Sequence, residues 1–135
     1  MERRPLVALE LAVLIALGGF AGANLRYAVG LAVPGLPGTL LVNAAGSFAL
    51  GFLVYEARYA GILPERTHVV VGTGFLSSFT TYSTFVLQSA QAPPALLVAN
   101  VVSTYALGFA GAVAGRELAG VVADGRPTPA REGAD

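Results

Sequence analysis

The chain of 135 residues is 55% hydrophobic and only 12% charged, with a mean hydropathy of +0.68. Soluble domains carry about 25% charged residues, so this composition indicates a membrane protein. The net charge is zero, cysteine is absent and His68 is the single histidine, which excludes disulfides, thiolate metal sites and a nucleic-acid-binding patch. These residues offer no convincing catalytic dyad, and we do not expect an enzyme.

Four segments are long and apolar enough to cross a bilayer as helices, which takes about 20 residues each. They lie at about residues 6–29, 39–55, 69–89 and 95–115, and short connections rich in proline, glycine or charge separate them. The sequence therefore predicts an all-α membrane protein with one four-helix transmembrane domain over residues 1–118. Residues 119–135 are rich in proline, glycine and charge, and we expect a disordered polar tail there. The first segment has no signal-peptide cleavage pattern and is interpreted as a retained helix.

The first segment contains small residues and two ionisable groups. Gly18 and Gly22 are one turn apart, a spacing that lets two helix backbones approach closely in lipid. Glu10 is either an intramembrane carboxylate that binds cations or protons, or an interfacial residue that pairs with Arg3 or Arg4. Arg26 either anchors the interface or draws anions into a vestibule.

Polar side chains also occur in the second and fourth segments. Asn43 lies about a turn inside the hydrocarbon, where it either bonds another helix or binds an ion. Asn100, Ser103 and Thr104 have the spacing i, i+3 and i+4, which places them on one face of a helix. The fourth segment therefore has a polar stripe.

The third segment is the most unusual part of the chain. Seven of the eight residues from Ser77 to Thr84 carry a hydroxyl, and Gly72 and Gly74 precede them. A hydroxyl in hydrocarbon needs a partner, so this density indicates a broken or strained helix whose polar edge lines a pathway. The alternative is that these hydroxyls bond to carbonyls one turn back in a non-conducting assembly.

The arginines are distributed unevenly between the two ends of the predicted helices. Four spans place both termini and the middle connection on one side, with Arg3, Arg4, Arg58, Arg66 and Arg116, against Arg26 alone on the other. The positive-inside rule then predicts a multi-pass protein of the cell membrane with both termini in the cytoplasm. The glycine-rich faces predict a dimer or a larger assembly.

The chain resembles the fluoride channel family known as Fluc or CrcB over roughly residues 18–115. The family's glycine-rich first helix with an Arg-Tyr pair corresponds to Gly18–Tyr27, and its Gly-Thr-Leu-x-x-Asn-x-x-Gly motif corresponds to Gly38–Gly46. Its long third-helix signature aligns with Gly74–Phe85, with Ser77 and Ser78 in place of paired glycines and Tyr82 in place of a phenylalanine.

This resemblance implies a fluoride-selective channel that exports fluoride from the cytoplasm and so lowers its toxicity. It also implies an antiparallel dimer in the lipid membrane, with a structural Na⁺ ion at its centre. The backbone carbonyls of Ser77 and Thr80 would hold this sodium, and Arg26 would be the vestibule arginine. Fluoride is strongly hydrated, so a pathway needs donors and positive aromatic edges to replace its water. The implied pathway residues are Asn43, Thr81, Tyr82, Ser83, Thr84, Phe85, Asn100, Ser103 and Thr104.

This chain differs from the family pattern in ways that lead to further expectations. Serine at position 77 is strained if the break needs a positive φ there. The arginine bias favours one orientation, whereas an antiparallel homodimer needs both, so the partner is either a second copy or an oppositely oriented paralogue. Two other functions are considered: a small four-helix proton-coupled multidrug exporter that uses Glu10, and a non-conducting subunit of a heterodimeric channel.

Overall fold

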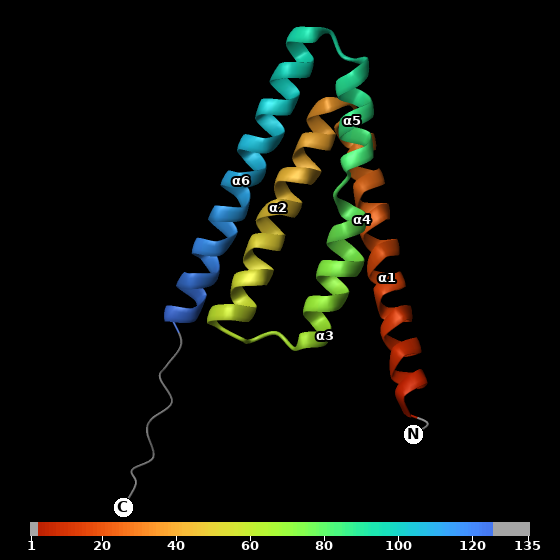
Figure 1. Cartoon of the computed structure of the whole chain (residues 1–135), viewed down its shortest axis with the longest axis vertical. Helices are drawn as coiled ribbons and strands as arrows, with labels where there is room; N and C mark the ends of the chain where they lie inside the picture. The colour runs from red at the N-terminus through yellow and green to blue at the C-terminus, as the bar shows by residue number, and fades with distance from the viewer. Residues whose placement is uncertain (1–2, 126–135) are drawn as a thin grey trace, which may run out of the picture.

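The computed structural model describes residues 3–125, and every regular element in this range is a helix (Figure 1). Four of its helical stretches are long and apolar enough to cross a membrane: Pro5–Ala32, Leu36–Tyr59, Glu65–Gln91 and Pro94–Asp124. The elements in chain order are α1 (Arg3–Ala32), α2 (Leu36–Tyr59), α3 (Glu65–His68), η1 (Val69–Leu76), α4 (Ser77–Phe79), α5 (Tyr82–Gln91) and α6 (Pro94–Asp124). The prediction of four membrane-spanning helices is confirmed.

Proline and glycine set the start of α2. Gly35 has a φ of 78°, a left-handed conformation that turns the chain immediately before the helix. Pro37 lies in the first turn, where a missing N–H costs nothing. The helix therefore begins at Leu36, before the expected residue 39, because Pro37 and Gly38 belong to its first turn.

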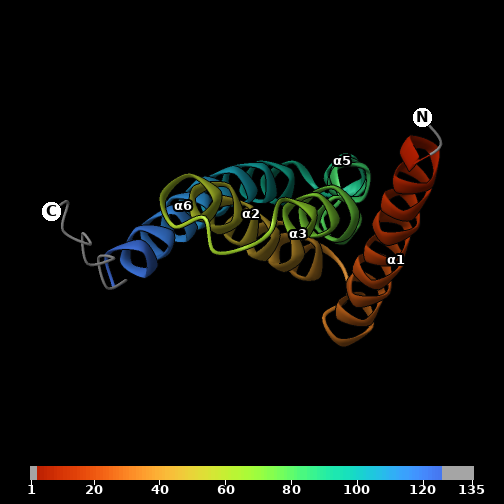
Figure 2. The same cartoon turned by 90° about the horizontal axis from the view of Figure 1, so that it is seen from below.

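The helices form two closely packed pairs. α2 and α6 lie side by side along their length, whereas α1 stands apart from them and packs against η1 and α4 (Figures 1 and 2). A side chain added at Gly115 would overlap the carbonyl oxygen of Phe48, and one added at Gly22 would overlap that of Phe75. The glycine spacings therefore serve contacts within one chain.

The last helix is longer than the sequence indicated. The predicted tail began at residue 119, but α6 continues to Asp124 and Ala119 is fully buried. That expectation is wrong for residues 119–124, because the apolar run Val121–Ala123 continues the helix until Asp124 and Gly125. Residues 126–135 of the predicted tail lie outside the described residues.

The four spans bring distant arginines to the same end of the molecule. The start of α1, the connection from α2 to α3 and the end of α6 lie together in Figure 1. Arg58 in the last turn of α2, Arg66 in α3 and Arg116 in the second half of α6 belong to this end. Arg26 lies toward the opposite end of α1, as the alternation of spans predicts.

Candidate functional site

The third span contains the predicted break. The π-helix η1 is followed in the chain by the short helix α4, which ends at Phe79. The next two residues, Thr80 and Thr81, are extended, with ψ values of 160° and 121°. Helix α5 restarts at Tyr82. Ser77 has a φ of −64° and lies in the ordinary helical region, so the strain expected for serine at this position does not arise.

Asn43 of α2 holds the break from the side. Its Nδ2 donates to the Thr81 carbonyl at 3.0 Å, and its Oδ1 accepts from the Thr81 N–H at 2.8 Å. One amide therefore satisfies both backbone groups of a residue that has left the helical ladder. Of the two roles open for Asn43, the helix–helix hydrogen bond is present. One Nδ2 hydrogen of the amide remains beyond the bond to Thr81.

The hydroxyls of the third span divide into two groups. Those of Ser77 and Thr80 bond to the carbonyls of Thr73 and Leu76, one turn back, as the alternative interpretation expected. Thr81 instead caps α5: its buried hydroxyl accepts from the Thr84 N–H at 3.2 Å. The same hydroxyl lies 3.0 Å from Thr84 Oγ1 and 3.4 Å from Ser83 Oγ. The break therefore brings Thr81, Ser83 and Thr84 into one hydroxyl cluster.

The aromatic pair of α5 has unequal environments. The rings of Tyr82 and Phe85 are 5.8 Å apart, but Tyr82 is 70% exposed whereas Phe85 is only 5% exposed. Phe85 also meets the ring of Tyr105 on α6 edge to face, at 6.3 Å. Sequence analysis did not assign Tyr105 to the site. Its position directly after Thr104, in the polar half of α6, could have indicated that it lies near the site.

The predicted polar stripe of α6 does not act as a uniform surface. Asn100 is buried and donates to Ser89 Oγ at 2.9 Å, and Ser89 donates in turn to the Phe85 carbonyl. Ser103 lines a cavity of 280 Å³ beside the start of α2. The Thr104 hydroxyl oxygen is buried without a hydrogen-bond partner among the described residues. Asn100 therefore links α6 to α5 by a hydrogen bond. Ser103 borders a cavity, and the hydroxyl oxygen of Thr104 has no partner among the described residues, so both hydroxyls could bind a ligand.

Arg26 lies in a vestibule cavity of 350 Å³ on one side of the break. Its Nη1 is 3.4 Å from the Thr80 carbonyl, so the cation is close to the extended residues. The buried amide oxygen of Gln88 has no hydrogen-bond partner within residues 3–125. Sequence analysis missed Gln88, although it follows Phe85 by three residues on the same helix face. The polar residues that share this cavity with Arg26 are Tyr27, Thr39, Thr81, Thr84 and Gln88.

A second cavity of 280 Å³, here called the inner cavity, borders Asn43 and Thr80. Its lining includes Asn43, Ser47, Ser77 and Thr80, so the two residues expected to bind sodium share one surface. Their backbone carbonyls are the neutral oxygen donors that suit a sodium ion, and the helical φ of Ser77 lets serine replace glycine. No cluster of three acidic, histidine or cysteine side chains occurs in the described part of the chain. The Thr80 carbonyl also lies 3.4 Å from Nη1 of Arg26, so one member of the expected donor set already faces a cation of the same chain.

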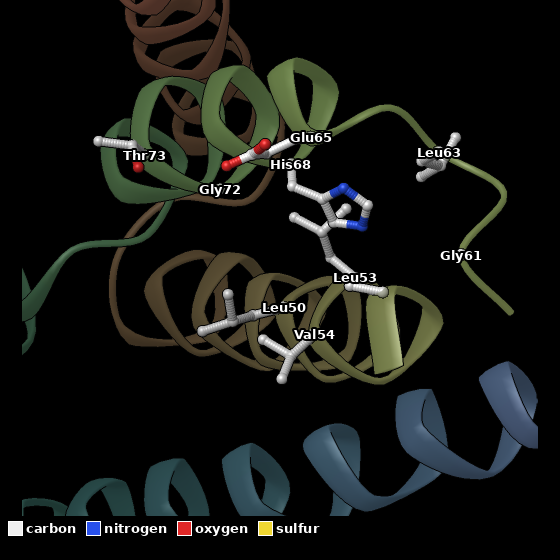
Figure 3. Close-up of a pocket in the computed structure, with 10 residues that line it drawn as sticks. Leu50, Leu53, Val54, Gly61, Leu63, Glu65, His68, Gly72 and Thr73 are labelled. Carbon is white, nitrogen blue, oxygen red and sulfur yellow. The ribbon is translucent and has the colours of Figure 1, made fainter. Parts of the chain in front are cut away.

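Both carboxylates of interest lie outside these cavities. Glu10 forms an ion pair with Arg66 at 2.7 Å, and both side chains are more than half exposed. Its partner in the structure is on α3, a contact that the sequence did not indicate, and the side chains of Arg3 and Arg4 lie outside the described ones. Glu56 is 1% exposed and pairs with His68. His68 also lines a groove of 710 Å³ (Figure 3). In the sequence, both residues lie in the short connection between the predicted segments 39–55 and 69–89.

Comparison with known proteins gives a consistent result. Residues 13–116 match the family described as "CrcB-like protein, Camphor Resistance (CrcB)". The "Fluoride-specific ion channel FluC 1" of Haloarcula marismortui is 57% identical over 92% of this chain and 97% of its own length. The "Fluoride-specific ion channel FluC 2" of Halobacterium salinarum is 54% identical over 78% of this chain and 84% of its own. A relative from Natronomonas pharaonis, also named FluC 1, is 50% identical over 78% and 90%.

Proposed function

This chain belongs to the CrcB-like protein family, and we propose from that premise that it is a fluoride-specific ion channel. It is a transporter and not an enzyme. The observation that carries the proposal is the break at Thr80 and Thr81, which places polar groups between two cavities within a hydrophobic span. Export of fluoride from the cytoplasm would lower its toxicity.

The proposed fluoride pathway runs past the break. An anion attracted by Arg26 enters the vestibule cavity, where Thr84 and Gln88 supply polar groups. The second Nδ2 hydrogen of Asn43 and the N–H groups in the first turn of α5 replace water around the ion. Phe85 presents a ring edge, which carries partial positive charge. Tyr82, Ser83, Ser103 and Thr104 complete the pathway when a second subunit is present.

We propose that two copies, or this chain and a paralogue, assemble antiparallel around a sodium ion. Each chain supplies two neutral carbonyl oxygens, those of Ser77 and Thr80, so two chains supply four. The ion would contribute a fixed positive charge beside an anion pathway. The high exposure of Tyr82 supports a partner that covers the start of α5, and the inner cavity beside Ser77 and Thr80 leaves space for the ion.

The exporter interpretation has little support. It requires an intramembrane carboxylate that is free to exchange protons, and Glu10 is instead exposed and paired with Arg66. The similarity to relatives named fluoride-specific ion channels also favours a channel. The substitution Glu10→Gln should therefore leave fluoride transport almost unchanged.

The decisive test is fluoride efflux from liposomes that contain only the purified protein, with chloride efflux as the control. Fast efflux of fluoride and slow efflux of chloride would support a self-sufficient channel. Efflux that appears only after co-reconstitution with a paralogue would identify a heterodimer. Absence of fluoride efflux from both preparations, with well-folded protein, would overturn the proposed function.

A further inference from the structure

Glu56 is a buried carboxylate at the end of α2 that belongs to neither cavity beside the break. Its Oε1 accepts from the backbone N–H of Ile62 at 2.5 Å and of Leu63 at 3.1 Å. Its Oε2 lies 2.8 Å from Nε2 of His68. A buried carboxylate is tolerated only when hydrogen bonds and an opposite charge compensate it. Ile62 and Leu63 belong to the connection between the second and third spans, and His68 belongs to α3 at the start of the third span, so Glu56 ties both to α2.

Both ring nitrogens of His68 lie near oxygen atoms that accept hydrogen bonds. Nδ1 lies 3.1 Å from the carbonyl oxygen of Pro64, and Nε2 faces the Glu56 carboxylate. Both neighbours are acceptors. A neutral imidazole has one N–H and one lone pair, so it can satisfy only one of them. The imidazolium donates to both and adds a positive charge against the carboxylate.

The remaining charged groups near this end are compatible with that state. Glu65 of α3 lines the same groove as His68 (Figure 3), and it adds negative charge. From α1, Glu10 is engaged by Arg66 of α3. On α6, Arg116 lies over the ring of Tyr55 and 3.6 Å from Glu117, while Arg58 is exposed on α2. The side chain of His68 is 19% exposed, so it can exchange protons with solvent.

We propose that Glu56 and His68 form a proton-dependent latch that fixes the α2–α3 connection and positions η1, the helix that leads to the break. The latch is closed while His68 is an imidazolium and Glu56 is a carboxylate. As pH rises and His68 loses its proton, one ring nitrogen turns a lone pair toward an acceptor oxygen and the latch weakens. As pH falls far enough to protonate Glu56, the charge attraction is lost instead. The inference does not depend on which ion the protein conducts.

The single histidine allows a direct test. The full chain, labelled with ¹⁵N-histidine and studied by NMR in a bilayer or micelle, reports only His68. We expect both ring nitrogens to carry hydrogen at neutral pH in the wild type, and one to lose it earlier in Glu56→Gln, where the charge partner is absent. A neutral ring in the wild type at neutral pH, or a titration that Glu56→Gln does not change, would overturn the proposal.

Hydrogen exchange at the Ile62 and Leu63 amides tests the consequence for the backbone. After correction for the intrinsic rate, protection in the wild type should fall at least about tenfold between about pH 5 and about pH 9, the loss of one charge-assisted bond. His68→Gln should show weaker protection without this pH dependence. Arg66→Gln, which removes the exposed pair with Glu10, is the matched control and should behave as the wild type. Protection that is independent of pH in the wild type would refute the latch, and the NMR result stands even if His68→Gln does not fold.

Discussion

At the scale of single residues, hydrogen bonds within one chain already satisfy much of the polar chemistry at the break. Asn43 binds both backbone groups of Thr81, and Asn100 binds Ser89. The hydroxyls of Ser77 and Thr80 return to their own helix. A fluoride pathway is therefore left with fewer free donors than the hydroxyl count suggested, and the positions of those donors depend on the amides that hold the break.

The two hydrogen bonds between the Asn43 side chain and the backbone of Thr81, here called the clamp, predict the effect of replacing Asn43 with an isosteric residue. Asn43→Asp keeps an acceptor for the Thr81 N–H but places a carboxylate oxygen against the Thr81 carbonyl. We expect the free energy of unfolding to fall by about 1–3 kcal/mol. Thermal unfolding in detergent measures it. Asn24→Asp is the matched control, because Asn24 makes only an exposed bond to Phe20 within α1. Equal effects at both positions would contradict the clamp.

The unequal burial of the two α5 aromatics predicts a separation of stability from transport. Phe85→Ala removes a buried ring and should lower the free energy of unfolding by about 3 kcal/mol, since the surrounding contacts are lost. Tyr82→Ala should leave the stability of the chain nearly unchanged, because Tyr82 is 70% exposed, while reducing fluoride efflux. Loss of stability without loss of efflux in Tyr82→Ala would exclude Tyr82 from the pathway.

At the scale of elements, glycines determine how closely the helices pack. α1 approaches the backbone of η1 at Gly18 and Gly22, and α6 approaches α2 at Gly111 and Gly115. Association in lipid depends on such close backbone contact, since lipid chains are as apolar as side chains. The position of the broken third span is therefore set partly by α1.

Alanine substitutions along α1 test this contact. Gly22→Ala should destabilise the chain by about 1–3 kcal/mol because its Cβ would overlap the Phe75 carbonyl. Gly30→Ala lies on the same helix with nothing within 4 Å of the added Cβ, so it should be neutral or stabilising. Thermal unfolding of the two variants makes the comparison, and a similar loss in both would mean that the contact contributes little.

At the scale of the whole molecule, one chain exposes a surface that carries large aromatic side chains. Tyr82 and Phe109 are about 70% exposed, and the inner cavity is open. A second subunit would close this face and complete the proposed sodium site. The arginine distribution, however, favours a single orientation in the membrane.

The proposed sodium ion predicts a cation-dependent assembly. Replacing Na⁺ with a large organic cation should weaken the dimer, because four carbonyl oxygens would then face one another without a cation between them. Dimer dissociation in detergent or bilayers, measured against protein concentration, checks this. A dimer of unchanged affinity after complete sodium removal would contradict the proposed site.

The excess of arginines at one end of the spans predicts how the chain is oriented in the membrane. If the partner is a paralogue, labels at either terminus of this chain in cells should be accessible from the cytoplasmic side alone. Equal populations that face both ways would instead indicate an antiparallel homodimer.

The sequence by itself determined the four spans, the break in the third and the family, because apolar length, hydroxyl density and a long motif are local properties of the chain. Only the tertiary structure decided which polar groups meet. The Asn43–Thr81 clamp joins residues 38 positions apart, and the Glu10–Arg66 pair joins residues 56 apart. Glu56 and His68 lie between two predicted segments in the sequence, and their burial became visible only once α2 and α3 were packed together. Local patterns carry no information on such pairings, which arise only when the spans come together.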